Sequence, residues 1–222
     1  MSDAAASAEF GPTPTGGWDD PDQIAWYTAR IGRLEARVAG EAVLRDLLPR
    51  APRRVLDLGC GDGRLAALVL EARASVEHVV AADRSEGMLE HARARFAGND
   101  RVAVVRYDLN EPLDFATAFD LIVSGFAIHH VDDARKKSLF RELRRALDPG
   151  GLLLNLEVVK SATPRRHQEF LAAIGRTADD PEDNLATIDE QLGWLVAADF
   201  VEAECMWRWR GFALLAAEAP SL

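Results

Sequence analysis

The chain alternates short apolar runs with longer segments in which apolar residues recur every three or four positions. The short runs predict buried strands, and the periodic segments between them predict helices. This repeated order is typical of a parallel sheet covered by helices. We expect parallel strands at 53–58, 77–83, 102–106, 119–124 and 152–158.

The last third of the chain follows a different pattern. From Pro164 it is mostly helical, and a helical period resumes over 185–198. Two strand-like runs, 200–208 and 212–218, are joined at Arg210-Gly211. Two runs separated by a glycine-containing turn predict an antiparallel hairpin at the end of the chain.

The N-terminal segment divides into two parts. Residues 1–17 are rich in Ala, Ser, Gly, Pro and Thr, which predicts a disordered tail. Residues 18–50 carry a helical period between Pro21 and Pro49, which predicts one or two helices. We expect the folded domain proper to cover 51–222, and we find no internal repeat.

A glycine-rich turn follows the first strand, with glycine at positions 59, 61 and 63. These glycines allow positive φ and let a ligand approach the backbone, and the next helix begins there with free N–H groups. A dinucleotide turn would need its third glycine at Arg64. The carboxylate of Asp57 would repel a pyrophosphate, but it would attract a ligand that carries an ammonium and a sulfonium.

The stretch Asp57-Leu58-Gly59-Cys60-Gly61-Asp62-Gly63 resembles motif I of the class I S-adenosylmethionine-dependent methyltransferases. The resemblance extends over about 53 to 218 and implies the cofactor S-adenosylmethionine, with S-adenosylhomocysteine as product. It implies an α/β, Rossmann-like sheet of seven mostly parallel strands in the order 3-2-1-4-5-7-6, with strand 7 antiparallel and helices on both faces. In this family, helices before the first strand often form a lid over the cofactor and substrate, so we expect residues 18–50 to form such a lid. The alternative is that these helices only cover an edge of the sheet.

The resemblance also indicates which residues bind the cofactor. Asp83 ends the second strand, where an acid accepts hydrogen bonds from a ribose diol; helix capping, its alternative role, suits Ser85 better. Asp108 follows the third strand, where the family places the acceptor for the adenine amino group; a solvated loop aspartate is the alternative. The cofactor-binding residues that we expect are Tyr27, Arg30, Asp57, Gly59, Cys60, Gly61, Gly63, Asp83, Arg84, Met88, Asp108, Leu109 and Ser124. Of these, Tyr27 and Arg30 are candidates for the cofactor's carboxylate, and Met88 is either near the adenine or in the core.

The catalytic candidates follow the fourth strand, at the edge of the sheet where ligands of open α/β sheets bind. The departing thioether is neutral, so the protein must mainly hold the nucleophile in line and accept its proton. An imidazole suits this task, so His129 or His130 is our candidate base or orienting group, and Glu157 is a second candidate. In the alternative reading, the histidine pair only holds its loop, because adjacent side chains of an extended chain point to opposite sides. We expect no metal site.

Composition limits the partners. The net charge of −10 disfavours nucleic acid. The sequence lacks an apolar run of about 18 residues and a signal-peptide pattern at Met1–Glu9, so we expect no membrane span and no secretion. Two cysteines without metal-ligand spacing suit a reducing cytoplasm. We expect a monomer or a homodimer.

Motifs that the sequence lacks narrow the class of possible substrates. Ser124-Gly125-Phe126-Ala127 stands where methylases of base amino groups carry Asp/Asn-Pro-Pro-aromatic, and neither cysteine suits cytosine methylation. A small-molecule methyltransferase that acts on oxygen or nitrogen remains, with carbon as a further option. An enzyme that modifies tRNA or protein, and a non-catalytic cofactor-binding subunit, are the alternatives. Aromatic residues that could wall a substrate pocket, or simply pack in the core, are Phe126, Phe170, Trp194, Trp207 and Trp209.

Overall fold

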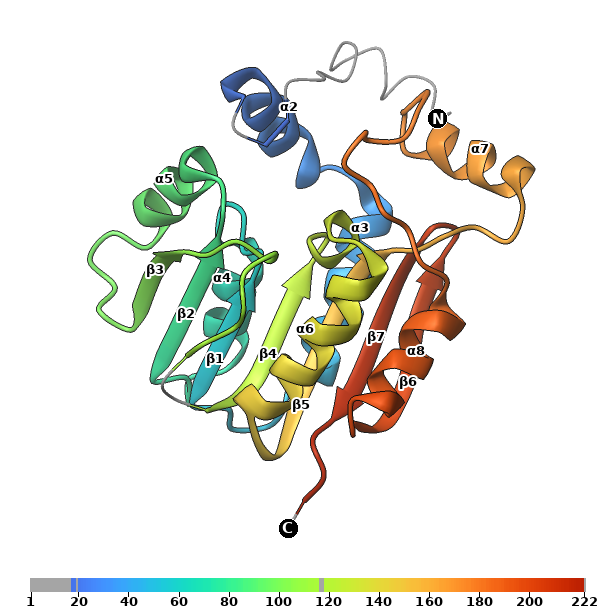
Figure 1. Cartoon of the computed structure of the whole chain (residues 1–222). Helices are drawn as coiled ribbons and strands as arrows, with labels where there is room; N and C mark the ends of the chain where they lie inside the picture. The colour runs from blue at the N-terminus through green and yellow to red at the C-terminus, as the bar shows by residue number, and fades with distance from the viewer. Residues whose placement is uncertain (1–16, 19, 116–117, 222) are drawn as a thin grey trace.

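The computed structural model describes residues 17–18, 20–115 and 118–221. Its centre is one seven-stranded sheet in the order β3-β2-β1-β4-β5-β7-β6 (Figure 1). The strands β1 to β5 are parallel, whereas β7 is antiparallel to both β5 and β6. This order confirms the predicted fold class. The strands are β1 Arg54–Leu58, β2 His78–Asp83, β3 Val102–Arg106, β4 Phe119–Gly125, β5 Leu147–Val158, β6 Val201–Trp209 and β7 Phe212–Glu218.

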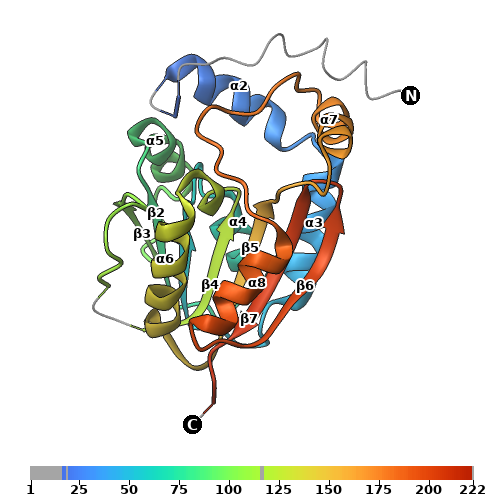
Figure 2. The same cartoon turned by 45° about the vertical axis from the view of Figure 1, so that its right-hand side comes forward.

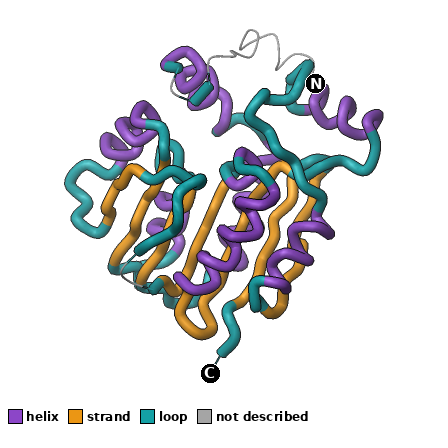
Figure 3. Tube along the Cα trace, in the orientation of Figure 1, coloured by secondary structure: helices purple, strands orange, loops and turns teal. Residues whose placement is uncertain are grey.

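Helices cover both faces of the sheet. In Figures 1 and 2, α6 and α8 lie on one face, and α3 and α4 lie on the other. The tube of Figure 3 shows the strands enclosed between these helical layers. The helices are α2 Pro21–Ile31, α3 Glu35–Leu47, α4 Arg64–Ala72, α5 Glu86–Arg95, α6 Asp133–Ala146, α7 Pro164–Ala173 and α8 Ile188–Ala197, with a 3₁₀ turn, η1, at Ile128–His130.

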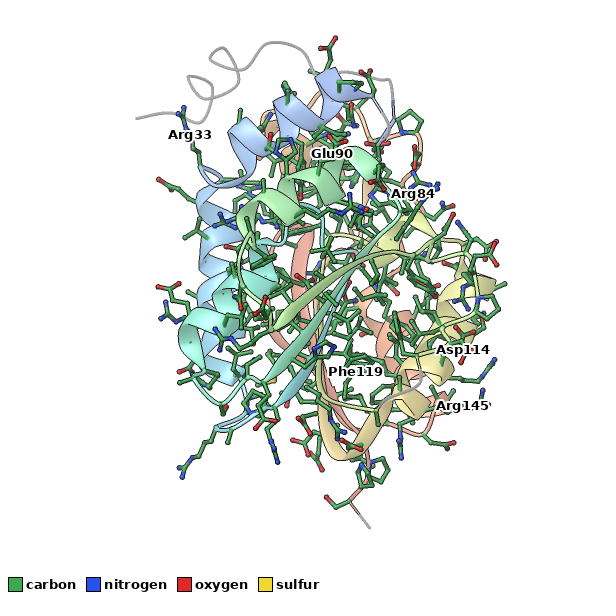
Figure 4. All side chains as sticks on the ribbon, turned by 90° about the vertical axis from the view of Figure 1, so that its left-hand side faces the viewer. Arg33, Arg84, Glu90, Asp114, Phe119 and Arg145 are labelled. Atoms are coloured by element: carbon green, nitrogen blue, oxygen red, sulfur yellow. The ribbon has the colours of Figure 1, made fainter. Side chains whose placement is uncertain are left out.

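The central strand β1 shows why the two layers form. Val55 packs into the cluster under α3 and α4, whereas Leu56 and Leu58 pack into the cluster under α6. Successive side chains of a strand point to opposite faces, so a strand that is covered on both faces must be apolar throughout. Side chains fill the space between the sheet and its helices (Figure 4). Asp57 is the exception in this strand, and its partner is described below.

The segment 18–50 forms two helices with different positions. Helix α3 packs on the sheet so closely that a Cβ at Gly40 would lie 2.8 Å from both Leu156 and Trp207. Helix α2 instead lies beyond the carboxyl ends of the parallel strands, and there Ile24 approaches Gly87 of α5. Part of the segment therefore covers a sheet face, and a lid movement of α2 stays a prediction. The expected disordered tail lies outside the described residues, apart from Gly17.

One difference concerns β5. We expected Asp148-Pro149-Gly150-Gly151 to precede this strand, whereas β5 begins at Leu147 and includes all four residues. The pairing of β4 with β5 is irregular between Phe119 and Leu121, and Gly150 has φ of 75°. The turn is thus built into the strand as an irregularity. No helix within the described part of the chain is long and apolar enough to cross a membrane.

Candidate active site

A first cavity lies where the carboxyl ends of β1, β2 and β4 meet. It encloses about 650 Å³, part of it open to solvent. Many residues expected to bind the cofactor line it, and they come from the glycine turn, the end of β2 and the loop after β3. The lining residues are Trp18, Tyr27, Gly59, Gly61, Asp83, Arg84, Met88, Tyr107, Asp108, Leu109, Asn110, Gly125, Phe126, Ala127, His130 and Val131.

The glycine turn needs its glycines for two different reasons. Gly59 has φ of 68°, and a Cβ there would lie only 2.1 Å from the Cβ of Ala127. Gly61 has φ of 54°, yet no atom lies within 4 Å of the position of its Cβ. The first glycine thus permits close packing of two loops, whereas the second exposes its backbone to the cavity.

Asp83 joins the turn to the end of β2. Its Oδ2 accepts a hydrogen bond from the Gly61 N–H at 2.8 Å, and its Oδ1 accepts one from the Ser85 N–H at 2.9 Å. Burial raises the pKa of this carboxyl group, although the backbone N–H groups oppose the rise. Ser85 caps α5 through the Met88 N–H, as the sequence suggested. A carboxylate offers about four lone-pair sites, so Asp83, which lines the cavity, can accept further hydrogen bonds and fits a ribose diol.

Two other residues that we expected to bind the cofactor already have partners within the protein. The Oδ1 of Asp108 accepts hydrogen bonds from the backbone and side chain of Asn110, at 2.9 and 3.0 Å, which leaves its Oδ2 for another donor. Arg84, which is labelled in Figure 4, pairs with Glu182 of the connection between α7 and α8. An acceptor at Asp108 and an acid at Asp83 thus line one cavity, and this arrangement fits S-adenosylmethionine.

Several expected cofactor residues lie outside this cavity. Asp57 is fully buried and points toward α4, where its Oδ2 accepts a hydrogen bond from the Ala66 N–H at 2.8 Å. Ser124 is buried and donates to the Leu58 carbonyl. Cys60 packs in a small core cluster, and Gly63 is the left-handed residue that begins α4. These four residues support the turn instead of lining the cavity.

Arg30 also lies elsewhere. The structure places it in a second cavity, where its guanidinium stacks 4.9 Å from the centre of the Trp26 ring. This cavity encloses about 870 Å³, part of it open to solvent, beneath α2 and α7. Its walls combine aromatic side chains with arginine and aspartate side chains. The lining residues are Trp18, Gln23, Trp26, Tyr27, Arg30, Leu34, Arg37, Phe126, His129, His130, Val158, Phe170, Leu171, Ile174, Arg176, Asp179, Asp180, Asp183 and Phe212.

Of the five aromatic residues that we considered for a pocket wall, Phe126 and Phe170 line this cavity. Trp194 packs against the core beside α8, and Trp207 and Trp209 pack against the clusters near α3 and α7. These tryptophans therefore have the packing role that was the alternative.

Four residues line both cavities: Trp18, Tyr27, Phe126 and His130. The Trp18 ring lies 4.9 Å from the Tyr27 ring and 5.7 Å from the His130 ring, in edge-to-face arrangements. Phe126 has φ of 56°, a strained value for a residue with a side chain. Arg37 stacks 4.7 Å from the Phe126 ring and donates a hydrogen bond to the Tyr27 hydroxyl. These contacts define a junction where molecules in the two cavities would meet.

Both histidines face the second cavity, because the chain at this point is a 3₁₀ turn instead of an extended segment. Their rings lie 4.0 Å apart. His129 is held on both sides: its Nδ1 lies 2.5 Å from the Glu157 carboxylate, and its Nε2 lies 3.3 Å from that of Asp183. Burial disfavours a charge on His129, but the two carboxylates outweigh it and raise its pKa to about 9.

His130 has the opposite environment. Burial and the neighbouring His129 charge lower its pKa to about 3. Its Nδ1 is buried without a hydrogen bond and lies 3.7 Å from the Asp183 carboxylate. His129 is therefore protonated and His130 neutral at neutral pH. Glu157 is buried behind His129, so it acts on the cavity only through that ring.

His129, His130 and Asp183 also offer ligand atoms within 4.8 Å of one another, the one such group found among the described residues. Two imidazoles and a carboxylate can hold a transition metal ion. The contact between His129 and Asp183 accounts for the same spacing without an ion, and the expected absence of a metal stays a prediction.

Sequence reasoning missed residues that approach the site from distant segments. Trp18 and Trp26 come from the N-terminal region, and Arg176 and Asp183 come from the connection between α7 and α8. The run of acids at 179–183 marked only a loop. No local motif signals that this loop folds back to the histidines, where the Asn184 N–H donates to the His129 carbonyl at 2.8 Å.

Comparisons with known proteins identify the family of the chain. Residues 55–151 match the sequence profile of the family described as "Methyltransferase domain". The chain is 41% identical over 181 residues to a demethylmenaquinone methyltransferase of Clavibacter sepedonicus, a match that covers 73% of this chain and 71% of the relative. It is 38% identical over 134 residues to a trans-aconitate 2-methyltransferase of Acidovorax sp., covering 58% of this chain and 48% of that protein.

A solved structure shows the same fold. Human N-acetylserotonin methyltransferase in complex with S-adenosylmethionine superposes with a TM-score of 0.68 at 16% identity. The superposition covers 99% of this chain and 66% of the human protein.

Proposed function

Since the chain belongs to the class I S-adenosylmethionine-dependent methyltransferases, we propose that it methylates an oxygen or nitrogen atom of a small molecule held in the second cavity. The observation that carries this proposal is the junction at which Trp18, Tyr27, Phe126 and His130 line both cavities. A cofactor in the first cavity and a substrate in the second would approach each other there.

S-adenosylmethionine supplies the methyl group as a sulfonium. The substrate atom forms a bond to the methyl carbon, the carbon–sulfur bond breaks, and its electron pair stays on sulfur. The substrate's proton must also leave. Neutral His130 lies at the junction and keeps one ring nitrogen with a free lone pair, so we assign it the hydrogen bond that orients the nucleophile and receives this proton.

His129 has a different role in this proposal. Because Glu157 and Asp183 hold it protonated, it has no lone pair to accept a proton. Its charge keeps His130 neutral, and its carboxylate partners fix the turn that presents His130. His129 and Glu157 are thus positioning residues.

The character of the second cavity supports a small-molecule substrate. Its aromatic walls suit an aromatic or apolar frame, and the named relatives act on demethylmenaquinone and on trans-aconitate. The net charge of −10 disfavours nucleic acid. The free cysteines, Cys60 and Cys205, support a reducing cytoplasm as the place of action.

The test is transfer of a trideuteriomethyl group from labelled S-adenosylmethionine to a panel of naphthols, aromatic amines and carboxylic acids, followed by mass spectrometry. We expect label on oxygen or nitrogen of at least one compound. His130→Phe should lower kcat about 10²-fold, because the lost group acts in the chemical step. The variant should still bind S-adenosylhomocysteine. His91→Phe, on the exposed surface of α5, is the matched control.

Unchanged turnover in His130→Phe would contradict the assigned role. Label found on carbon would contradict the proposed acceptor atom. Turnover that requires a second protein would support the alternative of a cofactor-binding subunit.

A further inference from the structure

Five of the described residues that line the second cavity carry a buried polar atom without a hydrogen-bond partner. Three of them are donors: the indole nitrogens of Trp18 and Trp26 and the Nε of Arg176. A buried donor without an acceptor costs about 1–3 kcal/mol. The other two such atoms in the lining are the Gln23 amide oxygen and the His130 Nδ1. Donors with no acceptor therefore collect in the wall formed by the N-terminal region and the segment after α7.

Arg30 adds a charge to this wall. Its guanidinium stacks on Trp26, and none of the described residues gives it a carboxylate partner. The half-buried position and the neighbouring charge of Arg176 both lower the pKa of Arg30. The Arg30 guanidinium is thus a cation near another cation, and it stacks on the Trp26 ring, whose indole N–H lacks an acceptor.

The acids of the same cavity do not neutralise Arg30. Asp179 lies 2.7 Å from His167, Asp180 lies 3.7 Å from Arg176, and Asp183 lies 3.3 Å from His129. Asp180 and Asp183 thus lie beside the cationic groups of Arg176 and His129, and Asp179 lies beside an imidazole ring. The positive charge of Arg30 remains for something that enters the cavity.

We propose that Arg30, with Arg176 and the Trp26 indole N–H, forms a subsite for a carboxylate carried by the substrate. The aromatic walls would hold an aromatic or other apolar frame, while a carboxylate would supply acceptors to donors that now lack them. The substrate class is therefore an aromatic carboxylic acid with a methylatable oxygen or nitrogen. This inference rests on the proposed function, because it assumes that the second cavity binds the methyl acceptor.

The cofactor's own carboxylate is the competing ligand. Arg30 lines the second cavity and lies outside the lining of the first, which favours the substrate. The experiment must separate these two ligands.

Calorimetric titration of the chain saturated with S-adenosylhomocysteine, using 1-naphthoate and the neutral, equally shaped 1-naphthamide, tests the subsite. We expect naphthoate to bind at least tenfold more tightly than naphthamide. Arg30→Gln should weaken naphthoate binding about tenfold and leave naphthamide and S-adenosylhomocysteine unchanged. The control is Arg165→Gln on α7, whose guanidinium is 71% exposed and pairs with Glu169. Circular dichroism of each variant checks folding.

Equal affinity for the two probes, or no binding of naphthoate, would overturn the subsite. Weaker S-adenosylhomocysteine binding in Arg30→Gln would assign Arg30 to the cofactor and overturn it as well. In each of these cases the unmodified chain would still transfer the labelled methyl group, so the proposed function would stand. Loss of the subsite and loss of the function are therefore distinguishable.

Discussion

The two adjacent histidines show how strongly local contacts decide the chemistry of a residue. His129 and His130 share one 3₁₀ turn, yet their pKa values move in opposite directions. Two carboxylates flank the first ring, whereas the second lies beside the resulting positive charge. Both residues are histidines in the sequence, and only the structure distinguishes the charged positioning residue from the neutral acceptor.

At the same scale, Gly59 and Gly61 form a matched pair for mutation. Both have positive φ, so alanine at either position should cost roughly 1–2 kcal/mol of backbone strain. Gly59→Ala also places a Cβ 2.1 Å from Ala127, which should cost about 1–3 kcal/mol more because two loops must separate. Urea unfolding of both variants measures the difference. Equal losses would show that the contact with Ala127 does not restrict the turn.

A network of ion pairs and hydrogen bonds joins the helices α2, α3 and α4. Glu41 of α3 accepts hydrogen bonds from Arg37 of the same helix and from Arg64 of α4, and Arg37 also contacts Tyr27 of α2. The side chains of Arg37 and Glu41 are each only 5% exposed. The network therefore fixes α2, and with it the junction, to the beginning of the helix that follows the glycine turn.

Glu41→Gln should destabilise the chain by about 3–5 kcal/mol, because it leaves the buried Arg37 without its anion. Glu169→Gln breaks an exposed pair on α7 and should leave the stability nearly unchanged. Urea unfolding compares the two variants. Similar small losses would mean that Arg37 finds other partners and that the network does not hold α2.

The contact of β1 with α4 predicts a pH dependence. Burial raises the pKa of Asp57 to about 7, against an ordinary value of about 3.9, and the nearby Asp83 and Asp62 charges add to the rise. The folded chain thus keeps a proton that the unfolded chain releases. The contribution of Asp57 to stability is fully present below about pH 4 and is lost as the pH rises through about 7.

In the cofactor-free chain, the free energy of unfolding should fall more steeply between about pH 4 and about pH 7 than in Asp57→Asn. The asparagine keeps an acceptor for the Ala66 N–H but cannot titrate. Denaturant unfolding at a series of pH values measures both slopes. Parallel curves would show that Asp57 does not carry the dependence.

At the scale of the whole molecule, the sequence predicted the sheet well because its signals are local. Most of the strands contain a short apolar run, the glycine turn follows β1 directly, and Asp83 ends β2, so sheet topology alone brings the turn and Asp83 together. The second cavity could not be predicted in this way. Its walls combine Trp18, Trp26 and Arg176, which are distant in sequence and meet only through the packing of α2 against the segment after α7.

Side-chain direction explains the remaining differences between the predicted and the observed positions of the site residues. Asp57 and Ser124 lie on strands beside the cavity, but alternation along each strand turns them into the interior. Tyr27 and Arg30 are neighbours on α2, yet only Tyr27 reaches the junction, while Arg30 reaches the second cavity alone. Sequence position located these residues near the site, and packing decided which cavity each one faces.

The central claim is that the cofactor lies in the first cavity against Asp83, so calorimetric titration with S-adenosylhomocysteine tests it most directly. Asp83→Ala removes an acceptor of charge-assisted hydrogen bonds, worth about 1.5–3 kcal/mol, and should weaken binding about tenfold to a hundredfold. Asp114→Ala, an exposed residue of the loop before β4, should bind as the unmodified chain does. If folded Asp83→Ala binds S-adenosylhomocysteine with unchanged affinity, the cofactor lies elsewhere and the account of both cavities is contradicted.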